Sequence, residues 1–285
     1  MGSRSKRRTI AAETLTIIQS GEYHLPDGSK VSITDDVNRM IAETILYAPG
    51  DFRSVLRKRD KRIAESSNPT APKISVENET TFAAASRLRA KSPDGSIMCL
   101  NFASAKNPGG GFLGGAQAQE ECLARASALY ASINPVQGYY QTNRRCGTCL
   151  YTDHMIYSPD VPVFRDDDDA LLKQPYQVSI LTAPAVNTGA VRRNEPQKID
   201  QIADVMTARI EKVLALAIAN DVRHLVLGAW GCGVFANDPT EVAQWFHDQL
   251  CERETIGRMF DEIVFAVLDR AKSQDNITAF VKQFG

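Results

Sequence analysis

The feature that most constrains the fold of this chain is the alternation of strand-length apolar runs with helical segments after residue 70. Four runs are nearly continuously apolar: 96–103, 176–185, 222–230 and 262–269. Such runs are typical of strands that are buried on both faces of a sheet. An amphipathic segment, 198–220, separates the second run from the third. Asp238, Pro239 and Glu241 then mark the start of a further helix. This order predicts an α/β fold, with a mostly parallel sheet covered by helices on both faces.

Charge and hydropathy exclude several classes of protein. The formal net charge is -1, so no overall field attracts the chain to nucleic acid or to a membrane surface. No apolar run approaches the ~20 residues that a membrane helix requires. The basic N-terminus "MGSRSKRR" is not followed by the apolar stretch of a signal peptide. We therefore expect a cytoplasmic protein with no membrane partner and no direct nucleic-acid binding.

The chain is expected to consist of two parts. Residues 1–70 are rich in charged helical segments and are predicted to form a helical extension packed on the core, with residues 1–8 disordered. The segment 65–73 is polar and contains two prolines, which is typical of a linker. Residues 71–285 are predicted to form the ligand-binding catalytic domain.

Two glycine-rich segments follow predicted strands. "NPGGGFLGG" (107–115) follows the strand 96–103, and "GCGVF" (231–235) follows the strand 222–230. Ligands of such sheets bind at the carboxyl ends of the strands, and glycine lets backbone N–H groups approach a phosphate closely. We expect an anionic ligand here in preference to simple tight turns. The chain contains no GxxxxGK[ST] motif, which excludes a P-loop. Residues 231–236 fit the looser GxGxxA form of a Rossmann motif, but the helix that follows starts at Pro239, after the motif and not within it, which argues against a Rossmann site.

Phe235 is a large apolar residue in a loop that should be exposed. It could anchor the loop in the core, or it could cover a bound base or sugar as a lid. The sequence leaves both interpretations open.

Glu120 and Glu121 open a predicted helix directly after the first glycine-rich segment. Neighbouring side chains on a helix point ~100° apart, so the two carboxylates can perform different tasks. Glycosidic cleavage needs an acid for the leaving oxygen and a carboxylate that activates water, and one group can do both in turn. The simpler alternative is a pair of surface glutamates favoured by the helix dipole. A general acid needs a raised pKa, so burial or ligand contact must outweigh that dipole.

Two other motifs could suggest a metal. Cys146 and Cys149 form a single CxxC without a second pair of ligands. The run Asp166–Asp169 is more typical of a solvated loop than of a cation site. We therefore expect no metal and no cofactor.

Three glycines, Gly109–Gly111, followed after a short spacer by Gln119, Glu120 and Glu121 resemble the signature of poly(ADP-ribose) glycohydrolases of the bacterial type. Further segments resemble the same family: 151–166, 181–187 and 228–238. The resemblance implies a macrodomain-like three-layer α/β/α sandwich with a mixed, largely parallel sheet and an N-terminal helical extension. It also implies binding of ADP-ribose.

The resemblance further implies an activity and a set of site residues. The enzyme would hydrolyse the ribose–ribose O-glycosidic bond of poly(ADP-ribose), mainly from chain ends, with Glu121 as acid/base and Glu120 positioning the ribose. Both glycine-rich segments would bind the diphosphate. The implied ADP-ribose ligands are Asn101, Asn107, Gly109, Gly110, Gly111, Gln119, Gly231, Cys232, Gly233, Val234 and Phe235. The implied partners are poly(ADP-ribose), ADP-ribosylated proteins and the product ADP-ribose, all bound by a monomer.

Two rival functions fit the same fold. A macrodomain can bind ADP-ribose without cleaving it, or it can remove mono-ADP-ribose without cutting polymer. The glutamate pair argues against a pure binding module, which has no use for two adjacent carboxylates.

Overall fold

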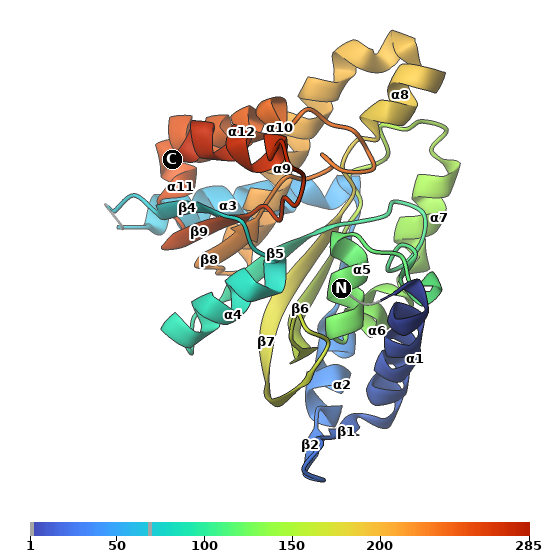
Figure 1. Ribbon diagram of the computed structural model, residues 1–285. Helices are drawn as coiled ribbons and strands as arrows, with labels where there is room; N and C mark the ends of the chain where they lie inside the picture. The colour runs from blue at the N-terminus through green and yellow to red at the C-terminus, as the bar shows by residue number, and fades with distance from the viewer. Residues whose placement is uncertain (1–2, 68–69) are drawn as a thin grey trace.

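The computed structural model describes residues 3–67 and 70–285. Within them, seven strands form one sheet in the order β3-β6-β7-β5-β8-β9-β4 (Figure 1). The strands are β3 (Ile45–Tyr47), β4 (Lys73–Glu77), β5 (Ile97–Phe102), β6 (Met155–Arg165), β7 (Leu171–Ala183), β8 (His224–Leu227) and β9 (Glu262–Ala266). The pairs β4·β9, β8·β9, β5·β8 and β5·β7 are parallel, whereas β6·β7 and β3·β6 are antiparallel. The predicted mixed, largely parallel sheet is confirmed.

Helices cover both faces of this sheet, and each face has its own core. One core contains residues of α3 (Phe52–Glu65), α9 (Ile202–Ala219), α10 (Pro239–His247) and α12 (Asp275–Phe284). The other contains residues of α1 (Arg4–Ser20), α2 (Thr34–Glu43), α4 (Thr81–Lys91), α5 (Gln119–Ala126), α6 (Leu129–Ile133) and α7 (Gln137–Arg145). The short helices α8 (Thr188–Asn194) and α11 (Glu254–Gly257) complete the α-helices of the described residues. The result is a three-layer α/β/α sandwich.

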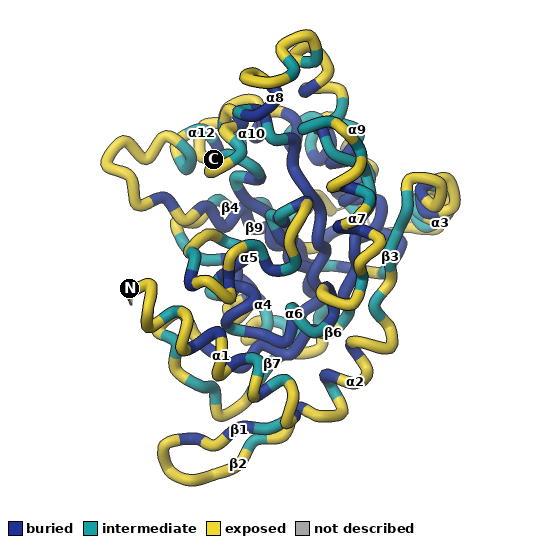
Figure 2. Tube along the Cα trace, turned by 90° about the vertical axis from the view of Figure 1, so that its right-hand side faces the viewer, coloured by how far each residue is buried: buried dark blue, intermediate teal, exposed yellow. Residues whose placement is uncertain are grey.

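The central strand β5 shows why the apolar runs become buried strands. Met98 and Leu100 belong to one core, while Ile97 and Cys99 belong to the other, because successive side chains of a strand point to opposite faces. All four side chains are buried. Figure 2 shows the same burial along the strands in the interior of the molecule.

The helix start predicted at Asp238 and Pro239 is confirmed. The Asp238 carboxylate accepts hydrogen bonds from the N–H groups of Thr240 (2.8 Å) and Glu241 (3.3 Å) and so caps α10. Asn220 caps the C-terminus of α9. The ends of these helices are therefore fixed by local side chains.

The N-terminal segment differs from its prediction. Residues 4–8 form the first turns of α1, with the Ser3 hydroxyl as the N-cap, and are not a disordered tail. Met1 and Gly2 lie outside the described residues. The extension is also not purely helical, because β1 (Glu22–His24) pairs with β2 (Lys30–Ser32) and β3 pairs with β6 at the edge of the main sheet. A domain boundary near residue 70 stays a prediction.

No helix within 3–67 and 70–285 is both long enough and apolar enough to cross a bilayer.

Candidate active site

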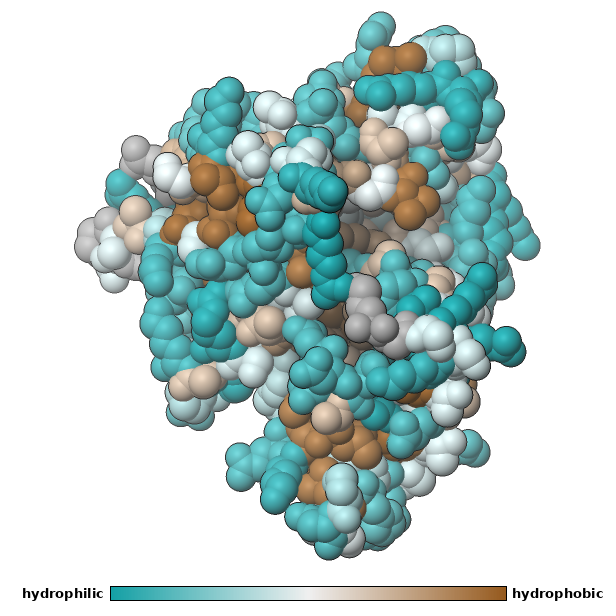
Figure 3. Space-filling view, in the orientation of Figure 1, coloured by the Kyte–Doolittle hydropathy of each residue, from teal (hydrophilic) through white to brown (hydrophobic). Residues whose placement is uncertain are grey.

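A cleft of about 950 Å³ opens where β5, β8 and β9 end. Both glycine-rich segments and the start of α5 line it. The C-terminal segment after β9 forms another wall. Figure 3 shows this side of the molecule as mostly hydrophilic, with a hollow near its centre. The cleft lies where a parallel sheet places its ligands.

Glu120 and Glu121 are both buried beside this cleft, with 3% and 9% of their surface exposed. Glu120 accepts hydrogen bonds from the Ser104 N–H at 2.7 Å and from the Asn101 amide at 3.3 Å. Glu121 accepts one from the Gly111 N–H at 2.9 Å. Glutamates that lie at a helix start only because the helix dipole favours them would be exposed on the surface. The alternative of two surface glutamates is therefore wrong.

Gly110 explains why the segment before the pair is rich in glycine. Its φ is 59°, a conformation that other residues rarely adopt. A Cβ added there would lie 2.4 Å from Glu121 Oε1 and 3.1 Å from Glu120 Oε2. The backbone therefore approaches the two carboxylates more closely than a side chain would allow.

Burial changes the acidity of the pair. It raises the pKa of Glu120 to about 8, although the hydrogen bonds from Ser104 and Asn101 oppose the shift. The negative charge of Glu121 adds to the increase. The shift means that the pair resists carrying two full negative charges near neutral pH.

Gln119 acts within the protein framework. Its side-chain N–H₂ donates to Leu100 O (2.8 Å) and to the Thr81 hydroxyl (3.1 Å), and its Oε1 accepts from Phe102 N (2.9 Å). These bonds attach the start of α5 to β5 and to α4. Gln119 lines the cleft, but its polar atoms are already bonded inside the protein.

The two predicted asparagines lie in different surroundings. Asn101 is fully buried and donates to Glu120 and to the Thr182 hydroxyl (3.1 Å). Asn101 is outside the cleft lining and holds the carboxylate in place. Asn107 is exposed and lines the cleft.

The second glycine-rich segment forms the opposite wall. Four of its five residues line the cleft, namely Gly231, Gly233, Val234 and Phe235. Cys232 does not line it and packs against the core that contains α9. Val234 is 88% exposed, so the middle of this loop remains open.

A buried asparagine that the sequence analysis missed holds this loop. The Asn237 Nδ2 donates to Val186 O (2.9 Å) and Gly231 O (3.1 Å), and its Oδ1 accepts from the Thr188 hydroxyl (2.7 Å). Asn237 is 4% exposed. Its place directly after the loop, within the segment 228–238, was the available signal.

Phe235 fits both of its interpretations. The ring is partly buried against the core that contains α9, and it also lines the cleft. It contacts the Tyr151 ring with centroids 6.0 Å apart, and Lys106 Nζ lies 5.9 Å from the centroid of Tyr151. An anchored ring can still offer one face to a ligand.

Two further stretches line the cleft although the sequence analysis gave them no such place. The run Asp166–Asp169 lies at the tip of the β6–β7 hairpin, where Asp167 accepts a hydrogen bond from the Thr80 hydroxyl at 2.8 Å. The second stretch follows β9, where Asp269 accepts hydrogen bonds from the N–H groups of Ala271 (3.0 Å) and Asn276 (3.0 Å). Composition alone could not show that these segments reach the site.

In the described part of the chain, one group of side chains could share a cation: His247, Asp248 and Glu252. None of the three lines the cleft.

Comparison with known proteins gives a consistent family. Residues 11–166 match the family described as microbial-type PARG, catalytic domain. The crystal structure of poly(ADP-ribose) glycohydrolase from Thermomonospora curvata superposes with a TM-score of 0.92 at 45% identity, covering 98% of this chain and 100% of that chain. A comparison with curated proteins gives no match.

Two related structures carry ligands. The Thermomonospora curvata enzyme bound to the inhibitor ADP-HPD has a TM-score of 0.89 at 44% identity, with 98% and 100% of the two chains covered. The Deinococcus radiodurans enzyme in complex with ADP-ribose has a TM-score of 0.81 at 44% identity, covering 89% of this chain and 98% of that chain. The matched residues 11–166 include the glycines and the glutamate pair. The chain belongs to the microbial-type poly(ADP-ribose) glycohydrolases, a family of glycosidases that hydrolyse poly(ADP-ribose).

Proposed function

We propose that this chain hydrolyses the ribose–ribose O-glycosidic bond of poly(ADP-ribose), mainly from chain ends, and releases ADP-ribose. The observation that carries the proposal is the buried pair Glu120 and Glu121, held at one end of a cleft whose opposite wall is the open loop 231–235. Burying two adjacent carboxylates costs free energy. A module that only binds ADP-ribose does not need two buried carboxylates, whereas a glycosidase uses them in catalysis.

The loop 231–235 is the better candidate for the diphosphate. The Gly111 N–H of the first glycine-rich segment already binds Glu121, while Gly233 has no atom within 4 Å of an added Cβ. A diphosphate at this loop would fix the distal ribose against the carboxylates, with the Phe235 ring over the sugar. Positioning of this kind lowers the barrier by removing orientational freedom before the reaction.

Glu121 is the proposed acid/base. Glu121 starts the reaction protonated and gives this proton to the leaving ribose oxygen while the bond from C1 to that oxygen breaks through an oxocarbenium-like state. Water then forms the new bond to C1 and gives one proton back to Glu121. Glu120 holds the ribose hydroxyl beside the scissile bond. Burial of the pair raises the pKa of Glu120, so the two carboxyl groups can share a proton near neutral pH.

The cellular setting belongs to the same proposal. We infer a cytoplasmic monomer that acts on poly(ADP-ribose) attached to proteins. The free cysteines of the structure suit a reducing compartment. The exposed large apolar side chains are scattered over several elements, which is common in monomers.

The test compares two substrates. Purified protein is incubated with poly(ADP-ribose) and, separately, with a mono-ADP-ribosylated protein, and released ADP-ribose is measured over time. The proposal predicts release from polymer, with ADP-ribose as the product from the first time points. Release from the mono-ADP-ribosylated protein alone would favour the mono-ADP-ribose hydrolase. Tight ADP-ribose binding without release from either substrate would favour the binding module.

A further inference from the structure

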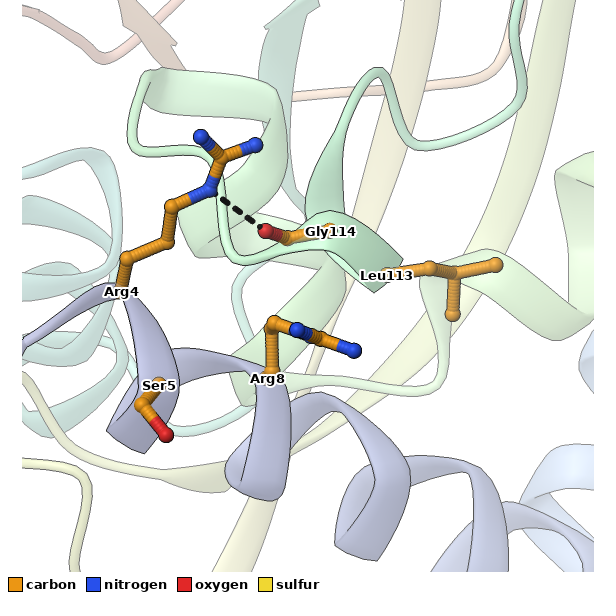
Figure 4. Close-up of a pocket in the computed structure, with 5 residues that line it drawn as sticks. All are labelled: Arg4, Ser5, Arg8, Leu113 and Gly114. Atoms are coloured by element: carbon orange, nitrogen blue, oxygen red, sulfur yellow. Dashed lines mark hydrogen bonds between the residues drawn. The ribbon is translucent and has the colours of Figure 1, made fainter.

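Helix α1 lies against residues 112–118, the spacer that follows Gly109–Gly111 and leads to α5. The Arg7 Nε donates to Gly115 O at 2.8 Å, and the Arg4 Nε donates to Gly114 O at 3.0 Å (Figure 4). Two guanidinium groups from the helix thus hold two successive carbonyl groups of the spacer. Hydrogen bonds from charged donors are stronger than those between neutral groups.

The same helix also contacts α5 itself. The Thr14 hydroxyl donates to Arg125 O at 2.7 Å in a buried contact. Ala11 packs with Phe112 and Ala124 in a small core separate from the two main ones. Helix α1 therefore touches the spacer and the helix that carries both glutamates.

Gly115 shows how closely the two segments meet. Its φ is 73°, and an added Cβ would lie 2.4 Å from Arg4 O, a backbone atom of α1. The neighbouring Gly114 differs, since an added Cβ there would meet only Arg4 Nη2, at 3.9 Å. The site at residue 115 therefore requires glycine because the helix backbone occupies the space of a side chain.

The spacer transmits this contact to the carboxylate. Gly114 N donates to Gly111 O at 3.0 Å, and Ala116 N donates to the same oxygen at 3.1 Å. The Gly111 N–H in turn holds Glu121 at 2.9 Å. A shift of residues 114–116 would therefore move the group that orients Glu121.

We propose that α1 is a positioning element of the active site, in which Arg7 and Gly115 fix the spacer so that Gly111 orients Glu121. This inference rests on the proposed role of Glu121. Arg7 also lines the cleft, but in this proposal it acts through the spacer and is a positioning residue. A displacement of about 1 Å at a reacting group can cost on the order of 100-fold in rate, so loosening this contact should reduce turnover strongly.

The first test compares Arg7→Ala with Arg39→Ala. Arg39 is exposed on α2, bonds Asp36 and does not line the cleft, so its removal controls for the loss of one positive charge. We expect kcat on polymer to fall roughly 10- to 100-fold in Arg7→Ala and to stay near wild type in Arg39→Ala. The Kd for ADP-ribose, measured by calorimetry, should stay near wild type in both.

The second test perturbs the contact without removing a charge. Gly115→Ala should lower kcat as Arg7→Ala does, because its methyl group would displace α1 from the spacer, whereas Gly114→Ala should retain kcat. If Arg7→Ala and Gly115→Ala matched their controls, the positioning role would be wrong. A variant that lost ADP-ribose binding together with turnover would also count against it, because general unfolding, or a direct contact between Arg7 and the ligand, would then explain the loss. Full activity of Glu121→Gln would instead refute the proposed function itself, which distinguishes the two failures.

Discussion

The two glycine-rich loops have similar compositions but opposite surroundings. In the first, an added Cβ at Gly110 would lie 2.4 Å from Glu121 Oε1, and the Gly111 N–H already binds that carboxylate. In the second, an added Cβ at Gly233 would meet no atom within 4 Å, and Val234 is 88% exposed. The first loop is closed around a carboxylate of the protein, and the middle of the second is open to solvent.

The same physical property serves both loops. Backbone N–H groups that are freed from side-chain bulk attract an anion. At the first loop that anion is a carboxylate from α5, while at the second loop we propose the diphosphate of the ligand. That both loops bind the diphosphate stays a prediction, although in the first loop the Gly111 N–H already binds a carboxylate of the chain itself.

Among the variants that test the difference between the two loops, Gly110→Ala should have the largest effect. The added methyl group would displace the carboxylate of Glu121, and φ at this position is 59°. We expect kcat on polymer to fall about 100-fold or more, with the Kd for ADP-ribose little changed. Steady-state polymer assays and calorimetry measure the two quantities separately.

Gly233→Ala is the matched comparison in the open loop. It should leave kcat near wild type, and any effect should fall on the Kd for ADP-ribose. If the two variants showed the same pattern, the division of tasks between the loops would be wrong.

A smaller effect is expected from Asn237→Ala. The change removes the hydrogen bonds to Val186 O, Gly231 O and the Thr188 hydroxyl. A buried polar group left unpaired costs about 1–3 kcal/mol, and a tenfold change in affinity corresponds to about 1.4 kcal/mol. We expect the Kd for ADP-ribose to rise about tenfold while kcat at saturation is retained.

The control for that variant is Asn220→Ala. Asn220 caps α9, with its Nδ2 donating to Leu216 O at 2.8 Å, and does not line the cleft. It should lower the melting temperature without changing the Kd. An Asn237→Ala variant that behaved in the same way would show that Asn237 stabilises the fold only.

A separate effect, on stability and not on turnover, concerns the pH dependence in Glu120→Gln. Burial raises the pKa of Glu120 from 4.5 to about 8, so the folded protein binds this proton more tightly than the unfolded chain does. The stabilisation is complete below the pKa that Glu120 has in the unfolded chain, and it is lost as the pH rises to the folded-state pKa of about 8. Relative to Glu120→Gln, the melting temperature of the wild type should therefore decrease from about pH 5 to about pH 8.5. If the melting temperatures of the two proteins changed in parallel with pH over that range, the pKa of Glu120 would not be raised.

The elements that the sequence predicts well are those with local signals. The apolar runs of β5, β8 and β9 and the capping residue Asp238 specify their elements through side-chain pattern and hydrogen bonding to nearby backbone. The glycines before Glu120 likewise indicate a close backbone approach. Short-range physics is sufficient in these places.

The features that were missed either break the regular local pattern or depend on distant partners. The strand β6 contains Asp160 at a φ of 44° and a register shift between Ser158 and Val161, which interrupts the alternation that marks a strand. The basic residues 4–8 resemble a disordered tail until Arg4 and Arg7 meet the carbonyl groups of the spacer. Asn101 serves Glu120 because the end of β5 faces α5, and no local pattern reveals that.

The central claim is that Glu121 is the acid/base, and Glu121→Gln tests it most directly. The amide keeps the shape of the side chain but cannot donate an acidic proton or accept one from water, and acid–base groups contribute typically ~10²–10⁴-fold. In a polymer-cleavage assay run beside calorimetry, Glu121→Gln should bind ADP-ribose nearly as wild type does and release almost none. Glu120→Gln should lose rate together with some affinity. If Glu121→Gln retained more than about a tenth of wild-type turnover, less than the loss expected for such a group, Glu121 would not be the acid/base.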